Sequence, residues 1–201
     1  MLKLDKNLFS DRIINITFII IIIICLLYIF MNITYAIQNQ GSPDLIITIN
    51  SDGSISNDGS LFGNDLWYPG KEENGIIRIN NNYKKVRVTG MGLDVVLSKY
   101  QSGYDKNEVM DSFLNSMELT IEKGKFLIFR QKILDKVKFS QLLNDSMNEI
   151  FKGYILENPH SFNVGRYDSI DLKYTLRMDE SAGSETQNLQ ADVQFMFNFE
   201  E

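Results

Sequence analysis

The chain has 201 residues, of which 44% are hydrophobic and 11% aromatic, and its formal net charge is −6. This composition supports one folded domain with an appended segment, and it excludes a collagen-like, Pro-rich or disordered chain. The negative charge argues against nucleic acid as a partner, because a phosphate backbone would be repelled. The single cysteine, Cys25, excludes an intrachain disulfide and a thiolate zinc cluster.

The first 36 residues have the pattern of a secretory signal. A short, weakly positive start precedes an unbroken apolar run over residues 18–31. Small residues follow at Thr34 and Ala36, the two relative positions at which signal peptidase has shallow pockets. We therefore expect signal peptidase to cleave between Ala36 and Ile37, which divides the chain into a signal peptide, 1–36, and a domain, 37–201.

A retained membrane anchor over residues 13–35 is the alternative, since a spanning helix needs about 20 apolar residues. The chain would then meet the membrane only through this segment, with its domain on the extracytoplasmic side. Residues 1–36 hold 3 of the 20 basic and 2 of the 26 acidic residues, so cleavage would leave 17 basic and 24 acidic residues and no cysteine. Export of a domain without disulfides is commoner in Gram-positive bacteria.

Most of the remaining pattern alternates with the two-residue period of β-strands. Residues 51–64, rich in Ser, Asn, Asp and Gly, are expected to form a polar loop. Gly90 and Gly92 suggest a bulge or bend within a long strand, and Lys123–Gly124 predicts a tight hairpin turn. The strands are predicted over residues 45–50, 75–80, 84–97, 118–122, 125–130, 169–178 and 189–199, the last with Phe195, Phe197 and Phe199 facing the core.

Two segments have helical spacing instead. In Asn107–Met117 the apolar residues form one stripe behind Asn107, which is expected to cap the helix. Residues Ser140–Phe151 show a similar stripe. The pattern as a whole predicts a mainly β fold: a single antiparallel β-sandwich with two inserted helices, preceded by an N-terminal hydrophobic helix.

The sequence offers no set of catalytic residues. His160 is the only histidine, so neither a zinc peptidase helix nor a nucleophile–histidine arrangement can be assembled, and we expect it to be a loop residue. No phosphate-binding glycine motif follows a strand.

Modification and metal sites are no better supported. Asn144 begins a glycosylation triplet but falls inside a predicted helix. Oxygen-bearing residues could hold calcium, but they fit solvated turns better: Asn50, Asp52, Asp65, Asp179, Glu180 and Glu185. We predict no catalytic residue, cofactor or metal.

Two stretches carry a pattern beyond strand alternation. The first runs over residues 66–72 and on to a strand ending in Asn, with the Pro69–Gly70 pair followed by Lys-Glu. The second, residues 176–188, is an acidic loop before the final strand and contains Glu185 and Gln187. Together they resemble the TasA/camelysin family of exported bacterial proteins, in which an acid directly follows the Pro-Gly pair and the late loop also has Asn and Tyr.

The resemblance implies a jelly-roll sandwich that is secreted and assembles into biofilm matrix fibres. It also implies structural roles for one set of residues: Trp67, Pro69, Gly70, Asn80, Asp179, Glu185 and Gln187. Pro69 fixes φ and Gly70 permits a positive φ, so this pair is expected to turn the chain into the next strand, while Trp67 caps one end of the core. Some members are described as metallopeptidases, a label that these residues do not support.

The leading hypothesis is therefore a secreted structural protein whose partners are copies of itself or related matrix proteins. A membrane-anchored accessory or adhesion domain is the alternative, and a camelysin-type metallopeptidase is a third. Assembly could proceed by strand donation: Leu45, Ile47 and Ile49, on a strand joined to the domain by a polar loop, would pair with a neighbour's open sheet edge. The competing expectation is that this strand pairs within its own domain.

Overall fold

The computed structural model describes residues 17–29, 42–62, 67–125, 129–144 and 151–201, and the chain divides into two units, Met1–Gly41 and Ser42–Glu201. In the first unit residues 17–29 are helical, with exposed side chains. Among the residues described, no helix is long and apolar enough to cross a membrane. The predicted cleavage site, Ala36–Ile37, and the ends of the predicted anchor lie outside the described residues.

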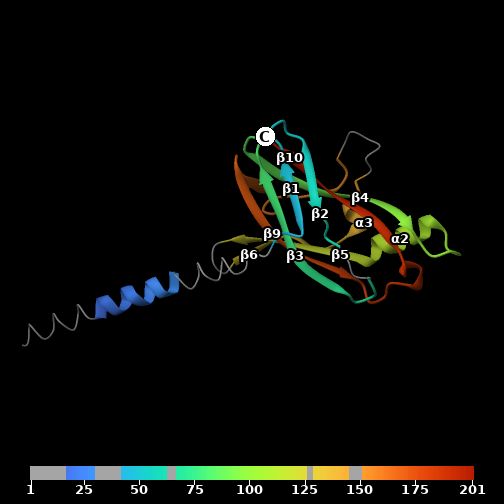
Figure 1. Ribbon diagram of the computed structural model, residues 1–201, viewed down its shortest axis with the longest axis horizontal. Coiled ribbons are helices and arrows are strands. Elements are labelled where there is room, and N and C mark those ends of the chain that lie inside the picture. The colour runs from blue at the N-terminus through green and yellow to red at the C-terminus, as the bar shows by residue number, and fades with distance from the viewer. Residues whose placement is uncertain (1–16, 30–41, 63–66, 126–128, 145–150) are drawn as a thin grey trace, which may run out of the picture. The chain divides into compact units, whose positions relative to one another are not determined.

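The second unit is mainly β and contains two sheets (Figure 1). The six-stranded sheet has the order β2 (Ile55–Gly59), β1 (Leu45–Ile49), β3 (Glu72–Asn81), β9 (Asp168–Met178), β5 (Met117–Lys125) and β6 (Phe129–Lys138). The four-stranded sheet contains β10 (Gln190–Glu200), β4 (Val86–Lys99) and β7 (Tyr154–Ile155), with β8 (Phe162–Val164) also paired to β4. The short helical elements are α2 (Lys106–Ser116), α3 (Phe139–Leu142) and η1 (Ser184–Thr186).

One hydrophobic cluster joins the two sheets. Alternate residues are buried along much of β1, β3, β9 and β10, as Leu45, Ile47 and Ile49 are in β1, so one face of each sheet supplies the core. Ile47 and Ile77 come from the larger sheet, and Leu93 and Phe195 from the smaller one. Every fully buried member of the cluster lies between residues 45 and 197, so the second unit has a core of its own.

Strand alternation located β1, β3, β4, β9 and β10 correctly. Phe195 and Phe197 are buried and Phe199 packs against the same cluster, which confirms them as core residues. The expected irregularity in β4 is also present: the register against β10 shifts between Gly90 and Val88, which leaves Thr89 unpaired. Packing also requires glycine at position 90, because the ring of Phe151 lies where a Cβ of this residue would be.

Two strand predictions were wrong. Residues 55–59, predicted as part of a loop, form β2; all five are exposed, so no alternation marks them. The turn predicted at Lys123–Gly124 is also absent, because β5 continues through both residues to Lys125. Its partner β6 extends to Lys138, and register shifts together with a positive φ at Lys136 interrupt the alternation there.

The predicted antiparallel pairing also needs correction at one place. Strand β1 pairs parallel to β3, so the larger sheet is mixed rather than antiparallel.

The helix predictions need correction at both sites. Helix α2 is present, but Asp105 rather than Asn107 caps it, by accepting from the backbone N–H groups of Asn107 and Glu108. The helix predicted over Ser140–Phe151 is present only at its start, and its described residues 143, 144 and 151 are not helical. Only Phe139–Leu142 is helical, Leu143 bridges Leu93 of β4, and residues 145–150 lie outside the described part.

Candidate functional site

The edges of the two sheets face each other along two sides of the domain. Along one of these sides, a loop of the smaller sheet closes the gap by binding the larger sheet. Residues 157–161 connect β7 to β8 of the smaller sheet and hydrogen-bond β6, the last strand of the larger one. The His160 Nδ1 atom lies 2.8 Å from the Lys132 carbonyl oxygen, and Gln131 Nε2 donates to the carbonyl of Pro159. Nearby, the Lys123 ammonium stacks 4.9 Å from the centre of the Phe162 ring. His160 is thus a loop residue, as expected, but it binds a strand edge.

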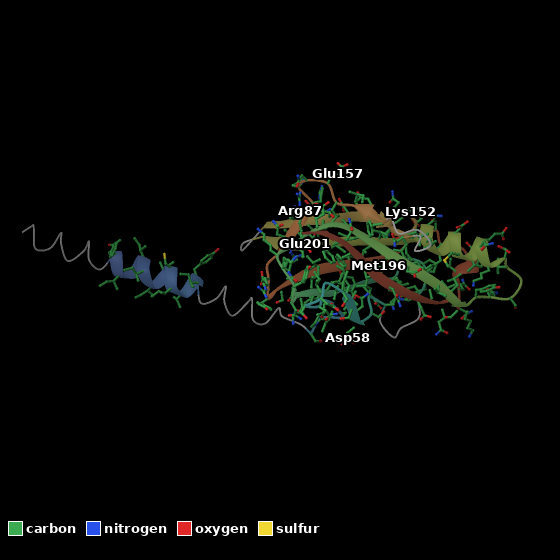
Figure 2. The ribbon with its side chains drawn as sticks, turned by 90° about the horizontal axis from the view of Figure 1, so that it is seen from above. Asp58, Arg87, Lys152, Glu157, Met196 and Glu201 are labelled. Atoms are coloured by element: carbon green, nitrogen blue, oxygen red, sulfur yellow. The ribbon has the colours of Figure 1, made fainter. Side chains whose placement is uncertain are left out.

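The opposite side is open, and it is the best candidate for a functional site. Strands β2 and β10 each end their sheet there, and we call these two strands and the space between them the open seam. Asn57 Nδ2 donates to the Phe195 carbonyl across it at 2.7 Å. Figure 2 shows Glu157 and Arg87 at one side of the unit and Asp58 of β2 at the other.

A pocket of about 350 Å³ lies within the open seam. Its lining mixes apolar side chains with amide and hydroxyl groups: Leu45, Ile55, Asn57, Gly59, Ser60, Leu61, Phe62, Val193, Gln194 and Phe195. Beneath it, the Tyr174 hydroxyl donates to the Leu61 carbonyl at 3.2 Å, and burial raises the pKa of this phenol. The lining residues include no acid, base or thiol, and they offer apolar contacts beside amide and hydroxyl hydrogen-bonding groups.

Charge distinguishes the two sides. The sequences of β2 and β10 contain the exposed carboxylates Asp58, Asp192 and Glu200 and no Lys or Arg, whereas β6 contains Arg130, Lys132, Lys136 and Lys138 against one carboxylate. Within the described ranges, no group of three or more His, Cys, Asp or Glu residues could hold a metal ion. Asn50, Asp52, Asp179 and Glu180 lie in separate turns or at strand ends, and Asp65 lies outside the described residues.

The two stretches that carry the family resemblance lie side by side. Lys71 N–H donates to the Tyr68 carbonyl at 3.0 Å, and Gly70 has φ of 83°, the geometry of a type II turn with Pro69 at its first corner. Gly70 N–H then donates to the carbonyl of Met178, the last residue of β9, at 3.0 Å. The turn was therefore predictable from its two residues, whereas its contact with the end of β9 was not.

The acidic connection between β9 and β10 is docked on α2. Ser112 donates its hydroxyl hydrogen to Glu185, and this bond lowers the pKa of the Glu185 carboxyl. Bonds from the backbone N–H and hydroxyl of Ser181 lower the pKa of Asp179 in the same way. Gln187 is exposed, and its backbone N–H closes the turn on Ser184. These contacts are structural.

Trp67 lies on the core, and the buried asparagine at the end of β3 is Asn81 rather than Asn80. Trp67 packs against the core, edge-on to Phe62 with ring centres 5.3 Å apart, and its buried indole N–H lacks a hydrogen-bond partner within the described residues. Asn80 is only half-buried, whereas its neighbour Asn81 is 1% exposed. Asn81 Nδ2 donates to the carbonyls of Lys84, Val164 and Gly165. Sequence reasoning missed Asn81, and no local signal separates it from Asn80.

The candidate donor strand β1 lies inside its own sheet, between β2 and β3, and Leu45, Ile47 and Ile49 are buried in its core. Asp44 secures the start of this strand: its carboxylate accepts from the Ile76 N–H at 2.8 Å, and its carbonyl accepts from Ser60 N–H at 2.9 Å. The loop that was expected to leave β1 loosely attached contains β2, which pairs with β1 along its whole length.

Comparison with models of known protein families and with curated proteins found no match.

Proposed function

We propose that this chain is an exported structural protein that assembles with copies of itself, in the manner of an extracellular matrix fibre subunit. The open seam carries the proposal. The edges of β2 and β10 leave backbone N–H and C=O groups free to pair with another chain, next to a pocket that accepts side chains. A jelly-roll arrangement of the two sheets and membership of a TasA/camelysin-like family of Gram-positive biofilm proteins belong to the same proposal.

The test is the assembly state of residues 37–201, which include every buried core residue. This fragment is expected to form oligomers or fibres as pH, salt and concentration are varied, because a contact between two different surfaces repeats from copy to copy and builds a ring where the rotation closes or a filament where it does not. Sedimentation and electron microscopy would show them. A fragment that stays monomeric throughout that range would refute self-assembly.

Strand donation by β1 is one route, and the structure suggests a sharper test of it than deleting residues 37–50. Deletion would remove a strand from between β2 and β3, with the buried Ile47. Thr48 and Asn80 are register partners on β1 and β3, so Thr48→Cys/Asn80→Cys would tie the strand into its own sheet through a disulfide. Residues 37–201 contain no other cysteine. If donation is correct, only the reduced form assembles; assembly of the oxidised form would exclude this route.

The alternative function is a cell-envelope accessory or adhesion domain, tethered by residues 13–35. The apolar, exposed helix over residues 17–29 favours it. The mass of the native protein decides between them, because a mature start at Ile37 means release and a full-length mass in the membrane fraction means tethering. A camelysin-type metallopeptidase would instead show chelator-sensitive cleavage of casein, which we do not expect.

A further inference from the structure

We propose that residues 157–161 are an edge guard, a loop that prevents β6 from pairing with a second copy of the chain. Strand β6 ends the six-stranded sheet on the side opposite the open seam. An edge strand presents a row of unpaired backbone groups, and such a row recruits other chains unless something covers it. The loop supplies that cover, whereas β10 and β2 have no comparable cover among the described residues.

The guard binds backbone and side chain of β6 at adjacent residues. The Lys132 carbonyl accepts from His160 Nδ1 at 2.8 Å, so the guard occupies a backbone group of this edge strand. Gln131 Nε2 donates to the Pro159 carbonyl from the next residue along β6. A second chain could pair with this stretch of β6 only after displacing both contacts.

The other sheet holds the guard in place. Arg87 of β4 donates from Nη2 to Asn158 Oδ1 at 2.5 Å and to Ser161 Oγ at 2.7 Å. Inside the loop, the His160 N–H donates to the Glu157 carbonyl at 2.7 Å and the Ser161 hydroxyl to Asn158 Oδ1 at 3.1 Å. The loop is therefore a bonded turn anchored on one sheet and placed against the edge of the other.

Strand β6 carries further features that hinder pairing. It has four basic residues, which repel the same strand of a second copy: Arg130, Lys132, Lys136 and Lys138. Its register against β5 shifts at two places, so the strand is not a flat template for pairing. The open seam has no basic residue on either strand. This asymmetry excludes the β6 edge from the surfaces through which copies of the chain associate. The inference deepens the proposed function by assigning which edge is excluded, but the guard can be tested whether or not the unaltered chain assembles.

The test removes the guard's hold on β6 while leaving the core intact. The full chain with Gln131→Ala/His160→Ala, in a mild detergent, is compared with the unaltered chain by sedimentation. Isotope-labelled and unlabelled copies are also mixed and treated with a lysine-reactive crosslinker. We expect about tenfold more association of the variant, since two hydrogen bonds that hold the guard are lost, with new crosslinks between the β6 lysines of different copies.

A second variant and a control complete the design. Arg87→Ala releases the loop from the other sheet and should give the same β6 crosslinks, so the result does not depend on one variant folding well. Asn163→Ala, at an exposed position of β8, should behave as the unaltered chain. Folded variants with no gain of β6 crosslinks would overturn the guard, as would β6 crosslinks in the unaltered chain. An unaltered chain that is monomeric, beside variants that crosslink through β6, would refute the proposed function and leave the guard standing.

Discussion

At the scale of single residues, a few polar side chains hold segments that are distant in the sequence. Asn81 joins the end of β3 to residues 84, 164 and 165, and its Oδ1 accepts from the Tyr83 N–H at 2.9 Å. The Asn81 side chain itself is 1% exposed, so water does not replace a partner that it loses. One side chain therefore fixes the relative placement of three segments.

Replacing Asn81 should be costly. Asn81→Ala is expected to lower the free energy of unfolding by about 3 kcal/mol, because the backbone groups of residues 83, 84, 164 and 165 lose the hydrogen bonds that this side chain makes with them. Urea denaturation of residues 37–201 measures the change. Asn80→Ala is the matched control and should stay within about 0.5 kcal/mol of the unaltered fragment. Equal effects at the two positions would contradict this account.

The acidic connection should loosen in acid. The folded-state pKa values of Glu185 and Asp179 are lowered, so the stability that their bonds provide is present above the unfolded-state pKa values and is lost as the pH falls through the folded ones. Below pH 4.5, the ordinary value for Glu, hydrogen exchange of residues 179–188 should therefore quicken. Ser112→Ala should reduce this pH dependence at Glu185. Hydrogen exchange of residues 179–188 that does not depend on pH, after correction for the intrinsic exchange rate, would contradict a stabilising role for the two carboxylates.

At the scale of elements, β4 is shaped to receive a side chain from outside the sheet. A Cβ added to Gly90 would lie 2.5 Å from a ring carbon of Phe151, and one added to Gly92 would lie 3.2 Å from another. These glycines let the segment after α3 return to β4, where β7 pairs with Gly90 and Met91. Asn144 secures the same segment, because its side-chain oxygen accepts from the Lys152 N–H at 2.8 Å.

Gly90→Ala is accordingly expected to destabilise the fragment by about 2 kcal/mol, the usual effect of overpacking. Thermal or urea unfolding gives the value. Gly124→Ala, on β5, serves as the control because nothing lies within 4 Å of its added Cβ, and it should be nearly neutral. A neutral Gly90→Ala would show that the Phe151 ring moves aside without loss.

At the scale of the whole molecule, the closed side and the open seam give each chain one available pair of edges. The hydrogen bond from Asn57 to the Phe195 carbonyl occupies a backbone group of β10 that an added strand would need. Asn57 therefore competes with any strand that enters the seam.

Asn57→Ala should promote assembly. Freeing the Phe195 carbonyl is expected to lower the concentration at which residues 37–201 assemble by roughly fivefold, the equivalent of one hydrogen bond of about 1 kcal/mol. Light scattering over a concentration series measures it, with Ser56→Ala on the same strand as the control. Unchanged or weaker assembly of Asn57→Ala would mean that the seam is not the contact.

The sequence by itself determined the mainly β class, most long strands and their buried faces, because side-chain alternation is a local property. It also located the Pro69–Gly70 turn, which two adjacent residues define. Only the tertiary structure decided where β2 and the end of β6 lie, since an exposed strand and a bulged strand show no regular alternation. The placement of Asn81, the parallel pairing of β1 with β3 and the docking of His160 on β6 likewise depend on residues far apart in the chain, and spacing along a sequence carries no record of such pairing.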